Sequence, residues 1–214
     1  MVQEKTRLDT RQNYDRLSRW YDSFSSSEQR LTELGLRLLN ILPGEKVLEI
    51  GFGTGHALIG LASAVGKAGS VYGIDLSPGM IIVARRRARH SGMGGRISMQ
   101  VGDASRLPFP NNQFQTAFMS FTLELFEIKE IPVILSECQR VLQPGGSLGI
   151  VSLAKKDTRA EEIYEWFHFR FPKIVDCRPI LIRPLLEAAG FEVGKTVVKR
   201  LWGLPVEAVV AKRI

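Results

Sequence analysis

Three glycines at alternate positions, Gly51, Gly53 and Gly55, form the part of the sequence best suited to bind a ligand. They follow an apolar run, 46–50, that is typical of a short buried strand, and they precede the helical pattern of 56–65. Because glycine lacks a Cβ, the backbone can turn sharply or lie against a ligand at each position. The next helix begins with unpaired N–H groups that suit a polar ligand. Strand, glycine turn and helix are the entry to a doubly wound α/β fold, although a tight turn without a ligand has the same pattern.

Carboxylates follow two further predicted strands. Asp75 ends the apolar run 70–75, and Asp103 follows the run 96–101. Ligands of open parallel sheets bind at the carboxyl ends of the strands, where a carboxylate can accept both hydroxyls of a ribose. For Asp103, a turn or helix cap is the alternative. Ser77-Pro78 predicts the N-cap and the first position of the next helix.

The remaining hydrophobic patterns continue this alternation of strands and helices. Leucines at helical spacing predict a helix over 28–42 that ends at Pro43-Gly44. Its buried stripe comprises Leu31, Leu34, Leu38 and Leu42. Further along the chain we expect a strand at 114–121, a helix at 131–142 ended by Pro144-Gly145-Gly146, a strand at 147–153, a short helix ending at Ala189-Gly190, and an antiparallel hairpin formed by 191–199 and 205–212.

Composition indicates one soluble α/β domain of 214 residues, with 44% hydrophobic and 24% charged residues. We expect no membrane-spanning helix, no signal peptide, and reduced cysteines at Cys138 and Cys177 in the cytosol. The net charge of +7 favours acidic partners, namely anionic lipid surfaces, nucleic acid or anionic small molecules, unless the basic residues form only a solvated surface. No nucleic-acid motif is present, so we expect no nucleic-acid partner. The helix after Pro78 is rich in arginine and is either a solvated basic face or a surface that binds anionic lipids. Its arginines are Arg85, Arg86, Arg87 and Arg89.

Four ordered motifs together resemble the class I S-adenosylmethionine-dependent methyltransferases. They are Glu49-Ile-Gly51-Phe-Gly53-Thr-Gly55, Asp75, Gly102-Asp103-Ala104, and Arg140-Val-Leu-Gln-Pro144-Gly145-Gly146. Within that class the chain is similar to the ubiquinone/menaquinone C-methyltransferase group and to related phospholipid N-methyltransferases. The resemblance implies a Rossmann-like, doubly wound, mostly parallel seven-stranded sheet with an antiparallel last strand and helices on both faces. It implies one domain, divided into an N-terminal helical lid (1–27), a cofactor-binding core (28–153), an acceptor-side cover (154–190) and a closing hairpin (191–214).

The resemblance also implies the cofactor, S-adenosyl-L-methionine, with S-adenosyl-L-homocysteine as the product. Glu49 would order the glycine loop and approach the cofactor's amino group. Asp75 would accept from the ribose hydroxyls, and Asp103 from the adenine amino group. The full set of cofactor-binding residues implied in this way is Tyr14, Tyr21, Glu49, Gly51, Gly53, Gly55, Asp75, Leu76, Met80, Gly102, Asp103, Ala104, Ser120 and Phe121.

The methyl acceptor is less defined, because the quinone enzymes carry a Phe-Gly-x-Arg-Asn element after strand four. The corresponding region here, Ser120-Phe121-Thr122-Leu123-Glu124-Leu125, lacks the Gly, Arg and Asn. We expect a small lipophilic acceptor, quinol-like or a phospholipid or amine head group, in a pocket formed by 10–27 and 160–183.

Methyl transfer from a sulfonium needs a base only if the acceptor must lose a proton. The candidates for this catalytic role are Glu124 and His168, although each can also be merely structural. Arg178 and Arg183 are candidates for binding an anionic group of the acceptor. We expect no metal site, a monomer or homodimer, and a cytoplasmic protein that is either soluble or peripheral at the inner membrane face. A non-catalytic S-adenosylmethionine-binding module and an NAD-dependent oxidoreductase are the alternative functions.

Overall fold

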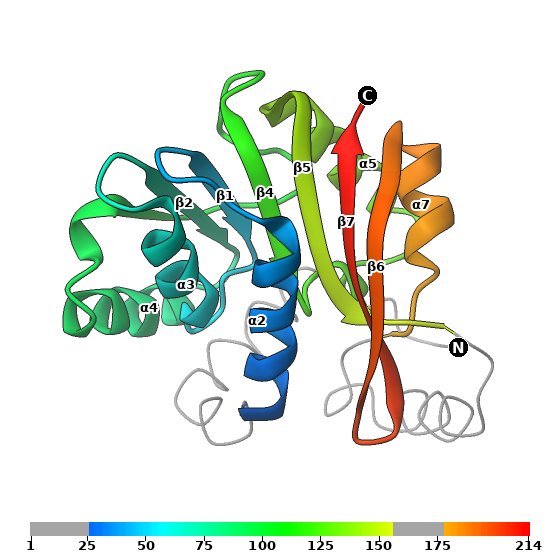
Figure 1. The fold of residues 1–214 in the computed structure, drawn as a ribbon, viewed down its shortest axis with the longest axis horizontal. Coiled ribbons are helices and arrows are strands. Elements are labelled where there is room, and N and C mark those ends of the chain that lie inside the picture. The colour runs from blue at the N-terminus through cyan, green and yellow to red at the C-terminus, as the bar shows by residue number, and fades with distance from the viewer. Residues whose placement is uncertain (1–25, 156–177) are drawn as a thin grey trace.

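The computed structural model describes residues 26–155 and 178–214, which form a single seven-stranded sheet with helices on both faces (Figure 1). Its strands are β1 (Lys46–Ile50), β2 (Ser70–Asp75), β3 (Ile97–Val101), β4 (Phe114–Ser120), β5 (Leu142–Leu153), β6 (Phe191–Leu201) and β7 (Leu204–Arg213). They lie in the order β3-β2-β1-β4-β5-β7-β6. Neighbours from β3 to β5 are parallel, whereas β7 is antiparallel to both β5 and β6. The predicted Rossmann-like sheet with a reversed last strand is therefore confirmed.

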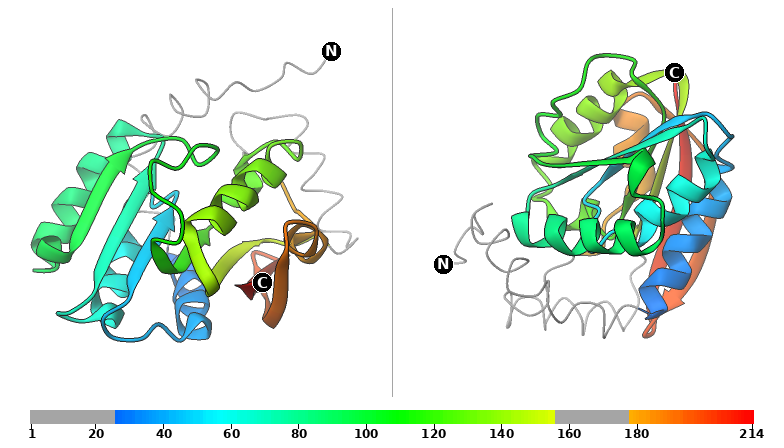
Figure 2. Two further views of the ribbon diagram at one scale, coloured as in Figure 1. Left: turned by 90° about the horizontal axis from the view of Figure 1, so that it is seen from above. Right: turned by 90° about the vertical axis from the view of Figure 1, so that its left-hand side faces the viewer.

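Helices cover both faces of this sheet (Figures 1 and 2). On one face lie α2 (Ser26–Leu39), α3 (His56–Val65) and α4 (Pro78–His90). On the other lie α5 (Ile131–Val141) and α7 (Ile182–Ala188). Helix α2 packs on β5 and β7, α3 on β1 and β2, and α4 on β2 and β3. Two short 3₁₀ helices, η2 (Gly94–Arg96) and η3 (Leu123–Leu125), precede β3 and follow β4.

The central strands are buried on both faces, as expected for parallel strands between two helical layers. Successive residues of β1 show the alternation. Val47 packs in the apolar cluster beneath α3, whereas Leu48 and Ile50 pack in the cluster beneath α5. Glu49 lies between them and is also buried, with 2% of its surface exposed. A buried carboxylate is costly unless it is paired or hydrogen-bonded. Glu49 is therefore a candidate ligand-binding residue at the carboxyl end of β1.

Helix α2 ends three residues earlier than the leucine pattern predicts. Asn40 takes a left-handed conformation (φ 51°) directly after Leu39, which stops the helix before Pro43-Gly44. Leu42 was predicted in the buried stripe, but it lies beyond the helix and 57% of it is exposed. Leu39 takes its place in the core.

Strand β5 begins earlier than predicted, and Pro144-Gly145-Gly146 lies inside it rather than ending a helix. Helix α5 already stops at Val141, and Leu142 pairs with Phe114 on β4. The β4–β5 register shifts before Thr116, and this irregularity accommodates the proline and the two glycines within the strand.

The closing hairpin forms as predicted, although both of its strands are longer than the sequence suggests. Leu201 pairs with Leu204, which leaves Trp202 and Gly203 as a two-residue turn. Both turn residues have positive φ, 50° and 87°. This turn is compatible with the twist of the strands, but a tryptophan rarely adopts that conformation. In the described part of the chain, no helix is long and apolar enough to cross a membrane.

Candidate functional site

The glycine loop between β1 and α3 is packed tightly at two positions and open at the third. Gly51, Gly53 and Gly55 all have positive φ, at 71°, 51° and 82°. A Cβ on Gly51 would lie 2.3 Å from the Thr122 side chain, and one on Gly55 would lie 2.8 Å from the Cβ of Ala84. A Cβ on Gly53 would meet no atom within 4 Å. The loop is therefore held against the protein at its ends and faces open space at Gly53.

Asp75 lies beside this opening at the carboxyl end of β2. Its Oδ2 accepts a 2.8 Å hydrogen bond from the amide of Gly53, and its Oδ1 accepts one of 2.9 Å from the amide of Ser77. The Ser77 hydroxyl accepts from the Met80 amide and caps α4, as predicted. Met80 is buried, and Leu76 is half-buried. The carboxylate of Asp75 is thus held in a fixed position relative to the glycine loop.

Glu49 contributes a second carboxylate near Asp75. Burial and then the negative charge of Asp75 raise the pKa of Glu49 well above its ordinary value. Its Oε2 is buried and has no hydrogen-bond partner. An unsatisfied buried acceptor costs roughly 1–3 kcal/mol, so this atom is suited to receive a donor from a bound ligand.

The segment 102–104 closes the same edge of the sheet. The amide of Gly102 donates to the carbonyl of Asp75 across 2.9 Å, which ties the ends of β2 and β3 together. Asp103 accepts from the amide of Ser105 at 2.8 Å, so its carboxylate also acts as the turn cap that the sequence allowed. Ala104 is buried. The structure therefore brings Asp103 to the same edge as Asp75.

The end of β4 forms the other side of the site. The hydroxyls of Ser120 and Thr32 are hydrogen-bonded at 2.6 Å. Phe121 has a positive φ of 50°, and its amide donates to the Val151 carbonyl. Thr122 then donates to the carbonyl of Gly51 at 3.2 Å. The strained turn at Phe121 therefore joins β4 to the glycine loop.

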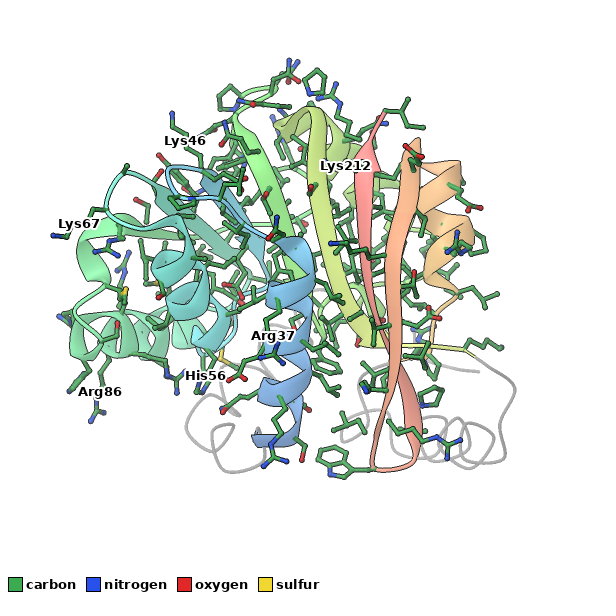
Figure 3. All side chains as sticks on the ribbon, in the orientation of Figure 1. Arg37, Lys46, His56, Lys67, Arg86 and Lys212 are labelled. Carbon is green, nitrogen blue, oxygen red and sulfur yellow. The ribbon has the colours of Figure 1, made fainter. Side chains whose placement is uncertain are left out.

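Helix α2 supplies contacts that sequence reasoning missed. Besides the contact of Thr32, Gln29 lies 2.9 Å from the Nε2 of His56, the first residue of α3. Figure 3 shows His56 at the lower end of α3, close to α2. The leucine pattern identified α2 only as a core helix. Polar residues in its first two turns carry no motif, so only the folded structure reveals that they line the site.

Glu124 is the buried carboxylate beyond the end of β4. Only 1% of the residue is exposed. Its Oε1 accepts from the amide of Leu153 at 3.2 Å, whereas Oε2 has no hydrogen-bond partner. Burial raises the pKa of Glu124 to about 8, against the opposing effect of hydrogen bonds from backbone amides and Ser152. The charge of Glu28 on α2 raises it further, and burial also raises the pKa of Glu28.

The two predicted acceptor-binding arginines occupy different environments. Arg178 is half-buried, and its amide donates to the Glu124 carbonyl at 3.2 Å. Arg183 is exposed on α7 and pairs with Glu187 at 3.3 Å. Their roles stay predictions. Tyr14, Tyr21 and His168 lie outside the described residues, as do the predicted lid and 156–177 of the predicted cover. Within the ranges 26–155 and 178–214, no cluster of potential metal ligands exists.

Two of the α4 arginines donate to backbone carbonyls of the protein, and of these only Arg87 is half-buried. Arg87 donates to the carbonyl of Thr54 in the glycine loop, and Arg85 donates to the carbonyl of Met99 at 3.3 Å. Arg86 and Arg89 are exposed. The arginines thus fan around the helix as the sequence predicts, and one of them supports the site.

Sequence comparison matches residues 47–146, which include the glycine loop and Asp103, to a family described as a methyltransferase domain. The demethylmenaquinone methyltransferase of Geobacillus kaustophilus is 29% identical over 163 residues, covering 74% of this chain and 68% of that enzyme. The ubiquinone/menaquinone biosynthesis C-methyltransferase UbiE of Neisseria gonorrhoeae is 33% identical over 159 residues, covering 74% and 62%. The chain thus matches about two thirds or less of the length of these curated relatives.

Structure comparison gives the same class of protein. A SAM-dependent methyltransferase from Aquifex aeolicus superimposes with a TM-score of 0.71 and 25% identity, covering 94% of this chain and 98% of that one. One from Methanosarcina mazei superimposes with a TM-score of 0.69 and 25% identity, covering 83% and 96%.

Proposed function

Because this chain belongs to the class I S-adenosylmethionine-dependent methyltransferases, we propose that it transfers a methyl group from this cofactor to a small lipophilic acceptor. The observation that carries the proposal is the opening at Gly53, bordered by the fixed carboxylate of Asp75. The methyltransferase-domain match spans the elements that build this opening.

S-adenosyl-L-methionine is the cofactor of this class, and the described residues fit it. The space at Gly53 leaves the loop accessible to a ligand. The unpartnered Oε2 of Glu49 suits a positively charged amino group, and Asp75 offers carboxylate oxygens of the kind that accept from ribose hydroxyls. Two carboxylates at one edge also favour a cation electrostatically.

The bound cofactor supplies a methyl group on a positively charged sulfur, which is already an activated leaving group. The protein's tasks are then to position the acceptor and to exclude water. Ser120 and Phe121 lie at the end of β4, next to the glycine loop through Thr122, where an acceptor could be positioned. Glu124 is the candidate proton acceptor on the same edge.

The names of the curated relatives favour a quinol-type acceptor. One observation favours an amine head group instead. When the quinone enzymes' Phe-Gly-x-Arg-Asn element is laid on Phe121–Leu125, Glu124 stands where the element has arginine. A buried carboxylate at that position suits a positively charged acceptor better than an anionic one.

Calorimetric titration with S-adenosylmethionine and with NADH, on wild type and on Asp75→Ala, tests the proposed function. We expect only S-adenosylmethionine to bind, and Asp75→Ala to weaken its binding at least tenfold. Labelled methyl transfer to hydroquinones and to long-chain amines then identifies the acceptor. Binding of NADH, or of neither ligand, would refute the proposal. Cofactor binding without transfer to any acceptor would indicate the non-catalytic module.

We also propose that the closing hairpin brings the protein to an anionic membrane surface from which a lipophilic acceptor is taken. Its tip exposes 42% of Val198 and 69% of Trp202, beside the exposed side chains of Lys199 and Arg200. Tryptophan favours the membrane interface, and basic residues are attracted to anionic lipids. The Pro205 carbonyl accepts from the Ala154 amide, so the tip adjoins the end of β5 at the edge of the proposed site.

A further inference from the structure

Glu124 is a buried carboxylate at the carboxyl edge of the sheet, and a second carboxylate, Glu28, acts on it through its charge. Glu124 follows β4, and its Oε1 is fixed by the amide of Leu153, the last residue of β5. Glu28 approaches from the first turn of α2, near enough for its charge to act on Glu124. The pair therefore lies where β4, β5 and α2 meet, beyond Ser120 and Phe121 along the chain.

No partner among the described residues compensates the unpaired oxygen of Glu124. Glu124 Oε2 is buried and has no hydrogen-bond partner. Neither carboxylate forms an ion pair with a lysine or arginine of residues 26–155 and 178–214. A leucine or methionine would fill the same volume without this cost. A carboxyl group retained at that cost, and held in place through its other oxygen, is suited to act on a ligand.

Resting on the proposed methyl transfer, we propose that Glu124 Oε2 receives the proton-donating group of the methyl acceptor, a phenol hydroxyl or an ammonium. In the step, the acceptor's O–H or N–H bond breaks and its electron pair stays on the acceptor as the nucleophile. The proton forms an O–H bond with ionised Glu124. The acceptor then takes the methyl group, and Glu124 later releases the proton to solvent.

Glu124 must be ionised to accept the proton, so the proposal has a pH signature. Because burial raises its pKa to about 8, the rate should rise with pH and level off above that value. Within 26–155 and 178–214, the groups that shift its pKa are Glu28 from α2, the Leu153 amide and Ser152 hydroxyl from β5, and its own backbone amide. Only Glu28 among these is charged. Removing that charge should move the rise to lower pH.

The experiment measures labelled methyl transfer to decylhydroquinone and to decylamine across pH, with wild type, Glu124→Gln and Glu28→Gln. Glu33→Gln, on the exposed side of α2, is the control. Calorimetry of S-adenosylmethionine and thermal unfolding report whether each variant is intact. We expect Glu124→Gln to bind the cofactor within threefold of wild type and to lose at least 100-fold in transfer. We expect Glu28→Gln to shift the pH midpoint down while transfer at high pH persists.

The two probes distinguish the source of the proton, since only the matching acceptor should be methylated and show the pH rise. Transfer by Glu124→Gln within tenfold of wild type, or a wild-type rate that does not rise with pH, would overturn the inference while the proposed function stands. If wild type binds no S-adenosylmethionine, the proposed function fails. If wild type binds the cofactor but neither probe, by calorimetry, a proton-donating acceptor of this class is excluded.

Discussion

Each glycine of the loop has a separate steric reason, and Gly51 gives the sharpest test. In Gly51→Ala the new Cβ would lie 2.3 Å from the Thr122 side chain, and φ would remain positive. The left-handed backbone costs about 1–2 kcal/mol, and overpacking adds about 1–3 kcal/mol. We therefore expect a loss of about 2–5 kcal/mol in the free energy of unfolding, measured by denaturant, together with weaker S-adenosylmethionine binding.

Gly44→Ala is the matched control for Gly51→Ala. Gly44 also has a positive φ, 91°, but an added Cβ would meet nothing within 4 Å. Gly44 lies ahead of β1, at the opposite end of that strand from the loop. Gly44→Ala should therefore lose only the about 1–2 kcal/mol of the left-handed backbone and should leave cofactor binding unchanged. Equal losses in the two variants would show that contact with Thr122 does not restrict Gly51.

The buried carboxyl of Glu124 predicts an unusual dependence of stability on pH. Its pKa is about 8 in the folded state against an ordinary value of 4.5, so between these values the folded state holds a proton that the unfolded state has lost. This stabilisation is complete below pH 4.5 and is lost as pH rises to 8, by up to about 1.4 kcal/mol per unit. Glu124→Gln should be increasingly more stable than wild type over that range in urea unfolding. A constant difference at pH 5, 7 and 9 would contradict the raised pKa.

The sequence predicts residues whose role depends on local backbone geometry. The glycine turn, the Ser77 cap and the position of Asp75 follow from neighbouring residues, and the structure has all three. The environment of Glu124 does not follow in that way. Its hydrogen bond comes from Leu153 and part of its raised pKa comes from Glu28, and both residues are distant in the sequence and belong to other elements. The unpartnered Oε2 of Glu49 likewise needs the packed structure before it can be seen.

At the scale of elements, α2 couples the core to the site through Gly35. This residue lets the helix lie close to β5, since a Cβ there would lie 2.4 Å from Cγ2 of Val151. Gly35→Ala should gain up to about 1 kcal/mol in helix propensity but lose about 1–3 kcal/mol through overpacking. We expect net destabilisation in thermal and urea unfolding. We also expect slower methyl transfer, because α2 positions Thr32 against Ser120.

A double-mutant cycle with Val151→Ala isolates the Gly35 contact. Removing Cγ2 leaves room for the new methyl group, so the double variant should be less destabilised than the sum of the single ones. Glu33→Ala, on the exposed side of α2, should change stability by less than about 0.5 kcal/mol. Strict additivity of Gly35→Ala and Val151→Ala would mean that the helix does not bear on β5 at this point.

Hydrophobic periodicity predicts which elements exist better than where they end. Strands β1 and β2 and helix α3 have their predicted bounds because glycines or charged residues flank compact apolar runs. Helix α2 departs from prediction because Asn40 adopts a left-handed conformation that leucine spacing cannot reveal. Strand β5 departs because pairing of Leu142 with β4 outweighs the usual effect of proline and glycine.

At the scale of the whole molecule, strand order places chemically distinct features along one edge. The ends of β3, β2 and β1 carry Asp103, Asp75 and Glu49, and the ends of β4 and β5 hold Glu124. Strand β6 is parallel to β5 through the intervening β7, so the hairpin tip lies at this edge too. Cofactor contacts, the acceptor carboxylates and the proposed membrane contact therefore follow one another across the sheet.

The membrane contact predicts binding to anionic vesicles that depends on the tip rather than on total charge. Wild type should sediment with phosphatidylcholine vesicles containing about one third phosphatidylglycerol, and less so at high salt, since each basic residue near the surface contributes about 1 kcal/mol. Lys199→Glu with Arg200→Glu should weaken binding at least tenfold, and Trp202→Ala should weaken it without changing the salt dependence.

Lys46→Glu with Lys67→Glu makes the same change in net charge on exposed residues away from the tip (Figure 3). That control should bind within threefold of wild type, because Lys46 begins β1 and Lys67 precedes β2, at the ends of those strands opposite the tip. Equal weakening by the two charge reversals would attribute binding to overall charge, and absence of binding by wild type would remove the hairpin as a membrane contact.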